Sequence, residues 1–171
     1  MGDSRKTVIV VWHDGDVPAG LEIRQVYGLL FTRDGRLLLT AEEKDGDMVY
    51  SLAGGHPEAS DDGMEGTLRR EVLEEINTAI GRPILVGYQE IIGDGSTPFA
   101  QVRMAALIEV IGERLPDPAT GRTFLRALIP AAKAAENLNW GEVGKAMVRA
   151  AVRIAGEKLG IQEFGGKEEW V

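Results

Sequence analysis

The order in which strand-like and helix-like segments follow one another limits this chain of 171 residues more than any other feature of its sequence. Short runs rich in β-branched and apolar residues come first and are separated by turn signals, which is typical of strands. An Asp-Gly pair at residues 34–35 predicts a tight antiparallel hairpin, and a similar turn follows at 44–47. The expected strands cover residues 7–12, 21–32, 37–40, 48–52, 84–92 and 101–111, with a short apolar segment at 124–129.

Helical periodicity occurs at residues 63–76 and 141–159. In the first segment Leu68, Val72 and Ile76 recur every four residues and predict one apolar helix face. Asp62 is expected to cap this helix together with Glu65. Asn77 would end it, and an Arg69–Glu65 pair would lie on its solvent side. The order strands, helix, strands, helix predicts a single α+β domain over residues 1–171, with helices packed on a mixed sheet.

The charge balance excludes several classes of partner. The chain has 27 acidic and 19 basic residues, a formal net charge of −8. Such a chain is expected to bind neither duplex nucleic acid nor an anionic membrane. It contains no cysteine, which excludes disulfides and thiolate zinc sites. No apolar run approaches the ~20 residues that cross a bilayer, so a cytoplasmic protein is predicted.

Three carboxylates lie close together on the first predicted helix. At about 100° per residue, Glu71, Glu74 and Glu75 occupy an arc roughly 100° wide beside the apolar stripe. Arg70 precedes Glu74 by four residues, where the two can pair. Like charges at this spacing repel, and a divalent cation with oxygen ligands, Mg²⁺ or Mn²⁺, would turn the repulsion into ligation. The competing interpretation is a solvated Glu-rich face without a ligand.

The glycines before this helix favour the metal interpretation. Gly54 and Gly55 end a predicted strand, where the absence of a side chain lets the backbone approach a ligand closely. Gly55 and the run Arg70-Glu71-Val72-Leu73-Glu74-Glu75 together resemble the Nudix box, Gly-x5-Glu-x7-Arg-Glu-U-x-Glu-Glu-x-Gly-U, where U is a bulky aliphatic residue. The resemblance covers about residues 5–160, and its specific part is the box region, about residues 55–78.

The resemblance implies a Nudix-type α/β/α sandwich and a metal-dependent hydrolase. Its metal ligands would be Gly55, through its carbonyl, and Glu71, Glu74 and Glu75. The catalytic group would comprise the three glutamates and Arg70, which would orient one of them. The reaction would cleave a phosphoanhydride bond of a nucleoside 5′-di- or triphosphate, that is, of a nucleoside diphosphate linked to another group. The alternative is a non-catalytic nucleotide-binding or sensor domain on the same fold.

The sequence departs from the box at several positions. Fourteen residues separate Gly55 from Arg70, one more than in the pattern, and either Asp61 or Asp62 replaces the first box glutamate. Asn77 and Thr78 replace the final Gly-U. The three helix glutamates are intact, which predicts an active although divergent box.

Residues outside the helix are candidates for substrate contact. Arg24 and Lys44 could meet a phosphate chain, Tyr50 could stack on a base, and His56 follows the glycine pair and could touch phosphate. Ordinary surface or packing roles compete with each of these assignments. The absence of cysteine argues against the isomerase branch of the superfamily. The expected protein is a monomer or homodimer that takes a nucleotide substrate.

Overall fold

The computed structural model describes residues 7–93, 95 and 97–171, so residues 1–6 of the expected domain lie outside the described residues. In chain order the elements are β1 (Ile9–Asp14), β2 (Glu22–Phe31), β3 (Arg36–Lys44), β4 (Asp47–Ser51), β5 (Gly54–Gly55), α1 (Gly63–Ile76), β6 (Thr78–Ile80), β7 (Ile84–Ile92), β8 (Phe99–Ile111), β9 (Leu125–Pro130), α2 (Ala131–Leu138), α3 (Gly141–Lys158) and β10 (Glu169–Trp170).

The strands form a mixed sheet. Its order is β1-β7-β8-β2-β3-β9-β10, while β4 pairs with β3, β5 with β2 and β6 with β8. The pair β2–β8 is parallel and the other pairs are antiparallel. The pair β2–β3 is short, with Leu30 opposite Leu38 and Phe31 opposite Leu37. The first half of β2 is therefore free to pair with β5, which carries the glycines.

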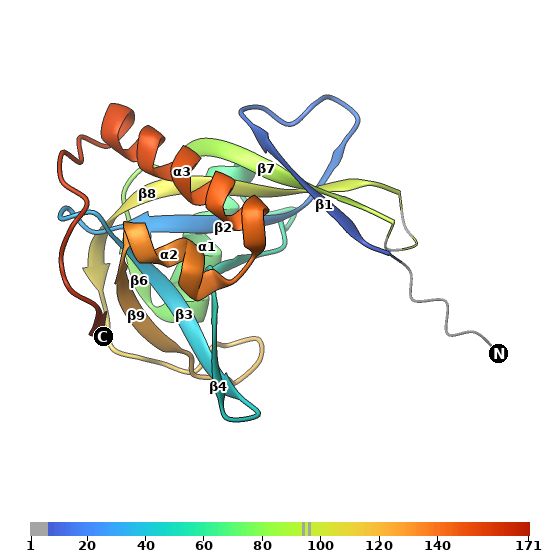
Figure 1. Ribbon diagram of the computed structural model, residues 1–171. Coiled ribbons are helices and arrows are strands. Elements are labelled where there is room, and N and C mark those ends of the chain that lie inside the picture. The colour runs from blue at the N-terminus through green and yellow to red at the C-terminus, as the bar shows by residue number, and fades with distance from the viewer. Residues whose placement is uncertain (1–6, 94, 96) are drawn as a thin grey trace.

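Helices cover both faces of the sheet, as Figure 1 shows, with α2 and α3 on one side and α1 on the other. Alternate side chains of β2 point to opposite faces. Val26 and Leu30 pack in the core layer that contains Leu68 of α1. Leu29 and Phe31 pack in the layer that contains α2 and α3. The predicted α/β/α sandwich with a mixed sheet is confirmed.

The first predicted helix has the expected bounds, and Asn77 ends it in the left-handed conformation with φ 45°. Its expected side-chain cap is wrong, because Asp62 makes no capping hydrogen bond. The expected Glu65–Arg69 pair is also wrong: Arg69 donates to the carbonyl of Ile80 at 2.7 Å. The structure adds α2, β5, β6 and β10, which are short or lack an apolar period of their own. Within the described ranges, no helix combines the length and apolarity needed to cross a membrane.

Candidate functional site at the glycine pair and helix α1

The glycine pair of β5 lies against the backbone of β2 on one side and against α1 on the other. Gly54 pairs with Tyr27 and has φ 148°, a conformation that side chains disfavour. A Cβ atom at Gly54 would lie 2.2 Å from the carbonyl oxygen of Val26. A Cβ at Gly55 would lie 2.5 Å from the carboxyl carbon of Glu71. Gly54 therefore requires glycine, because a side chain there would meet the backbone of β2, whereas a side chain at Gly55 would displace the carboxylate of Glu71.

Two of the helix carboxylates face this backbone. Leu68 and Val72 are fully buried on the sheet side of α1, which turns Glu71 and Glu75 toward the glycines. Oε2 of Glu75 accepts a hydrogen bond of 2.9 Å from the amide of Gly54. Burial is the main cause that raises the pKa of Glu75 to about 7, and the negative charge of Glu71 adds to the rise.

Arg70 is the centre of a charged network beside these carboxylates. Its Nε donates to Oδ1 of Asp61 at 2.8 Å, and its Nη2 donates to Oδ2 of the same residue at 3.0 Å. Nη1 donates to Glu71 at 3.0 Å and to Glu74 at 3.2 Å, and Nη2 also reaches the carbonyl of His56 at 2.9 Å. The predicted Arg70–Glu74 pair is present, and Arg70 connects the loop to the helix.

Asp61, and not Asp62, is the loop residue that meets Arg70. Its Oδ2 also accepts from the hydroxyl of Thr67 at 2.8 Å and from the amide of Glu58 at 2.9 Å. The hydrogen bonds from Arg70 are the main cause that holds the pKa of Asp61 well below its usual range. The open question of which aspartate replaces the first box glutamate is answered by this geometry: the extra loop residue lies after Asp61.

The donor atoms of this site are all oxygen, the type that Mg²⁺ and Mn²⁺ prefer. Glu71 and Glu75 repel each other strongly enough to contribute to the raised pKa of Glu75, and a cation would relieve that repulsion. The carboxylates therefore fit a hard divalent metal by their chemistry. Among the residues that the structure describes, no three acidic or histidine side chains converge on one point as a ready-made metal site.

The predicted substrate residues lie in different places. His56 belongs to the loop, where its carbonyl binds Arg70 and its Nε2 lies 3.5 Å from the amide nitrogen of Gln25. Arg24 lies on β2, where its Nε donates to Glu22 at 2.8 Å and its guanidinium covers the ring of Phe99.

Lys44 and Tyr50 lie on the β3–β4 hairpin. Lys44 pairs with Glu42 at 3.1 Å, and the ring of Tyr50 stacks on Trp170 near the C-terminus. In the described part of the chain, neither side chain makes a hydrogen bond or ion pair with the three helix carboxylates. The structure thus joins the main chain of His56 to Arg70 and places the side chains of Lys44 and Tyr50 in other contacts.

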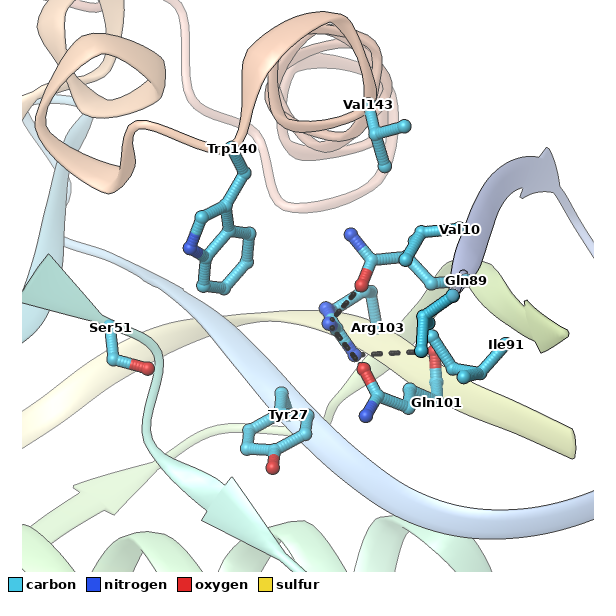
Figure 2. A pocket seen from close by; sticks show the side chains of 10 residues that line it. Val10, Tyr27, Ser51, Gln89, Ile91, Gln101, Arg103, Trp140 and Val143 are labelled. Atoms are coloured by element: carbon cyan, nitrogen blue, oxygen red, sulfur yellow. Dashed lines mark hydrogen bonds between the residues drawn. The ribbon is translucent and has the colours of Figure 1, made fainter. Parts of the chain in front are cut away.

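Sequence reasoning missed a pocket of about 560 Å³ on the opposite face of the sheet (Figure 2). Its polar side chains come from β2, β4, β7 and β8, and Trp140 covers it from the α2–α3 connection. Arg103 is only 2% exposed and lies at its centre. The available signal was the polar residues Gln89, Gln101 and Arg103 inside otherwise apolar strands. We refer to this cavity as the Arg103 pocket; it is lined by Val8, Val10, Tyr27, Ser51, Gln89, Ile91, Gln101, Arg103, Trp140 and Val143.

Solved structures of other proteins have a similar fold. A NUDIX hydrolase from Nitrosomonas europaea matches with a TM-score of 0.57 and 14% identity, over 83% of this chain and 93% of that chain. The Escherichia coli ORF135 protein matches with a TM-score of 0.53 and 15% identity, over 84% and 98%. A variant of the Bacillus subtilis pyrophosphohydrolase BsRppH matches with a TM-score of 0.50 and 23% identity, over 61% of this chain and 63% of that chain.

A comparison with curated proteins found no match. The family model of the NUDIX domain matches residues 22–127, which is more than half of the chain and includes the glycine pair, α1 and the parallel strands β2 and β8. The fold and the family match agree, and the chain belongs to the Nudix hydrolase family.

Proposed function

We propose that this protein is a divalent-metal-dependent hydrolase that cleaves a phosphoanhydride bond of nucleoside 5′-di- or triphosphates. The observation that carries the proposal is the approach of Glu71 and Glu75 to the backbone of Gly54 and Gly55. This approach concentrates carboxylate charge at one place, and the family generally uses divalent metals. We assign the activity to a single domain over residues 1–171, with a cytoplasmic location.

Glu71, Glu74 and Glu75, with the carbonyl of Gly55, are the proposed ligands of Mg²⁺ or Mn²⁺. When bound, the metal would neutralise phosphate oxygens and lower the pKa of a water molecule. Arg70 has a positioning role, because it holds Glu71 and Glu74 to the loop through Asp61.

Glu75 would gain most from a bound cation. Burial, with the charge of Glu71, raises its pKa to about 7 in the metal-free protein, and a divalent cation would stabilise its carboxylate form. Two further groups surround it, because the charges of Asp117 and Glu42 contribute to the raised pKa. The loop that carries Asp117 therefore lies near the proposed reaction centre.

The test is release of phosphate or pyrophosphate from a panel of nucleoside di- and triphosphates, with Mg²⁺ and with EDTA. We expect Mg²⁺-dependent release by the wild-type protein and its loss in Glu74→Gln and Glu75→Gln. Glu65→Gln is the matched control, since Glu65 lies on the same helix and its ion-pair partner is Arg82, at 3.6 Å. Undiminished hydrolysis by both ligand variants would contradict the metal assignment.

One observation favours the sensor as a second candidate. Glu71 and Glu74 are engaged by Arg70, and Glu75 by Gly54, so the carboxylates have partners within the protein. Nucleotide binding without turnover across the whole panel would select a non-catalytic domain.

A further inference from the structure

The Arg103 pocket contains a buried cation without an acidic partner. Arg103 is 2% exposed, and no carboxylate forms an ion pair with it within residues 7–93, 95 and 97–171. Its guanidinium lies 4.7 Å from the ring centroid of Tyr27 and 5.8 Å from that of Trp140. Figure 2 shows the guanidinium between these two rings. Aromatic faces attract a cation but do not neutralise it.

The hydrogen bonds of Arg103 are also incomplete. Nη2 donates to Oε1 of Gln89 at 2.7 Å and to Oε1 of Gln101 at 3.3 Å. Nη1 reaches only main-chain carbonyls, at 3.2 and 3.3 Å. Nε is buried and is the one buried side-chain nitrogen or oxygen without a partner in the described residues. A buried donor without an acceptor costs roughly 1–3 kcal/mol, and because protein atoms cover Nε, a ligand could accept from it only after a shift of the guanidinium.

The two glutamines make the pocket rich in donors. Because a guanidinium only donates, each glutamine beside it must turn its amide oxygen toward Arg103. Gln101 uses its amide nitrogen to bind Gln25. The amide nitrogen of Gln89 points toward the side of the pocket that Trp140 and Val143 form (Figure 2). The polar groups that Arg103 and Gln89 present to the pocket are therefore N–H groups, which require acceptors on the ligand, whereas the hydroxyls of Tyr27 and Ser51 can donate or accept.

The walls of the pocket suit a flat ring. Val10, Ile91 and Val143 are aliphatic, and Trp140 and Tyr27 are aromatic. The volume of about 560 Å³ lies within the usual range for small-molecule sites, roughly 300–1,000 Å³. A fully hydrated phosphate would leave these apolar walls unused, whereas an aromatic heterocycle would cover them.

The pocket adjoins the proposed reaction centre through one residue. Tyr27 lines the pocket and contacts Arg103, and it pairs with Gly54 in the sheet. Burial raises the pKa of the Tyr27 hydroxyl, the charge of Arg103 opposes the rise, and the charges of Glu75 and Glu71 add to it. The pocket thus borders, through Tyr27, the strand β5 that carries Gly54.

We infer that the Arg103 pocket binds the base of the nucleotide substrate and selects bases that carry a carbonyl acceptor, with Arg103 and Gln89 as the specificity-determining residues. This inference rests on the proposed function, because it names the substrate class of the same site. An oxo group would accept from the free N–H groups. An amino group at the same ring position would face donor against donor, and the buried N–H groups would stay unpaired.

The test uses two pairs of nucleotides in which an oxo group and its neighbouring ring N–H are exchanged for an amino group and an unprotonated ring nitrogen. IMP and AMP differ in an oxo or amino group on a purine, and UMP and CMP differ likewise on a pyrimidine. Binding to the full chain is measured by calorimetry without divalent metal. We expect about tenfold tighter binding of the oxo member in at least one pair, and the pair that discriminates identifies the ring. Equal affinities in both pairs, or no binding of any of the four, would overturn the inference.

Two variants assign the discrimination to named residues. Gln89→Glu keeps the size of the side chain, supplies the carboxylate that Arg103 lacks and removes the amide donor. We expect the preference to fall below about twofold while the melting temperature is maintained or raised. Arg103→Met should also remove the preference, and Arg82→Met is the control, because the side chain of Arg82 is 78% exposed. A tenfold preference retained in Gln89→Glu would overturn the assignment.

The same preparations separate this inference from the proposed function. Hydrolysis of ITP and ATP is measured with Mg²⁺ alongside the binding of IMP and AMP. Preferred binding of IMP without hydrolysis of either triphosphate would contradict the proposed function and support the pocket inference. Hydrolysis of both triphosphates, with equal binding within the IMP/AMP pair and within the UMP/CMP pair, would support the proposed function and contradict the pocket inference.

Discussion

Arg70 and Arg103 lie on opposite sides of the central sheet and in opposite electrostatic surroundings. Arg70 binds Asp61, Glu71 and Glu74, and the hydrogen bonds to Asp61, followed by those to Glu71, raise its pKa. Arg103 meets two glutamines and two aromatic rings, and burial lowers its pKa to about 10. One side of the sheet therefore has an excess of carboxylates, whereas the other has a cation that no carboxylate neutralises.

This difference shows how an acidic chain with a net charge of −8 can take an anionic substrate. The clustered carboxylates would be stabilised by a cation, and a metal ion bound there could also bind the phosphates of the substrate. The guanidinium of Arg103 would be stabilised by hydrogen-bond acceptors on the base of the same nucleotide. Tyr27 joins the two sides, so one nucleotide could satisfy both needs.

On the carboxylate side, the largest effect is expected at Glu75. In the protein without divalent metal, this residue makes the free energy of unfolding depend on pH. Its pKa is raised to about 7, so the folded state binds a proton more tightly than the unfolded state. The stability from this group is fully present below the unfolded pKa and is lost as the pH rises to about 7. Between pH 4.5 and 8, we expect wild type to lose about 3 kcal/mol relative to Glu75→Gln.

Urea unfolding in EDTA at both pH values measures this loss. Glu65→Gln should follow the wild-type curve, since it leaves Glu75 in place. A constant difference between wild type and Glu75→Gln at the two pH values would show that Glu75 ionises normally.

The second-largest effect is expected when the Arg70 side chain is removed from the carboxylate side of the sheet. In Arg70→Met the loop loses its link to Glu71 and Glu74, and the carboxylates are left without their internal counter-charge. We expect kcat for Mg²⁺-dependent hydrolysis to fall about 10- to 100-fold, the range seen when residues that orient metal ligands are removed. Steady-state kinetics at saturating Mg²⁺ measures this, with Arg82→Met as control. A change confined to KM would contradict a positioning role.

The smallest effect is expected at Gly55. A Cβ atom in Gly55→Ala would lie 2.5 Å from the carboxyl carbon of Glu71, so that carboxylate must move. We expect about a tenfold loss of kcat, because small displacements of a reacting or ligating group lower rates strongly. Gly165→Ala is the matched control, since a Cβ there has no neighbour within 4 Å. Equal kcat values for the two variants would argue against a role of the Gly55–Glu71 contact.

Features that depend on local spacing were predictable from the sequence. The bounds of α1, its left-handed end at Asn77 and the pairing of Arg70 with Glu74 all follow from residues within one or two helical turns. The loop was harder, because an inserted residue shifts every later position. Choosing Asp61 over Asp62 required the hydrogen bonds from Arg70 and Thr67, which depend on the path of the backbone.

The Arg103 pocket could not be predicted, because its residues are far apart in the chain. Tyr27, Gln89, Arg103 and Trp140 meet only when β2 and β8 pair in parallel and the α2–α3 connection covers the sheet. Alternation within a strand shows which residues share a face, but it does not show which strands are neighbours. The helix α2 was missed because its alanine-rich sequence is compatible with many conformations. Its position depends on packing against α3, which is far from obvious in the sequence.

Binding of Mn²⁺ tests the central claim most directly, because it needs no substrate assignment. Electron paramagnetic resonance counts free Mn²⁺ as the protein is titrated with the ion, for wild type, Glu71→Gln/Glu75→Gln and the control Glu65→Gln. We predict that wild type and the control bind Mn²⁺ and that the double variant does not. Equal binding by all three proteins, or none by wild type, would contradict the assignment of the metal to these carboxylates.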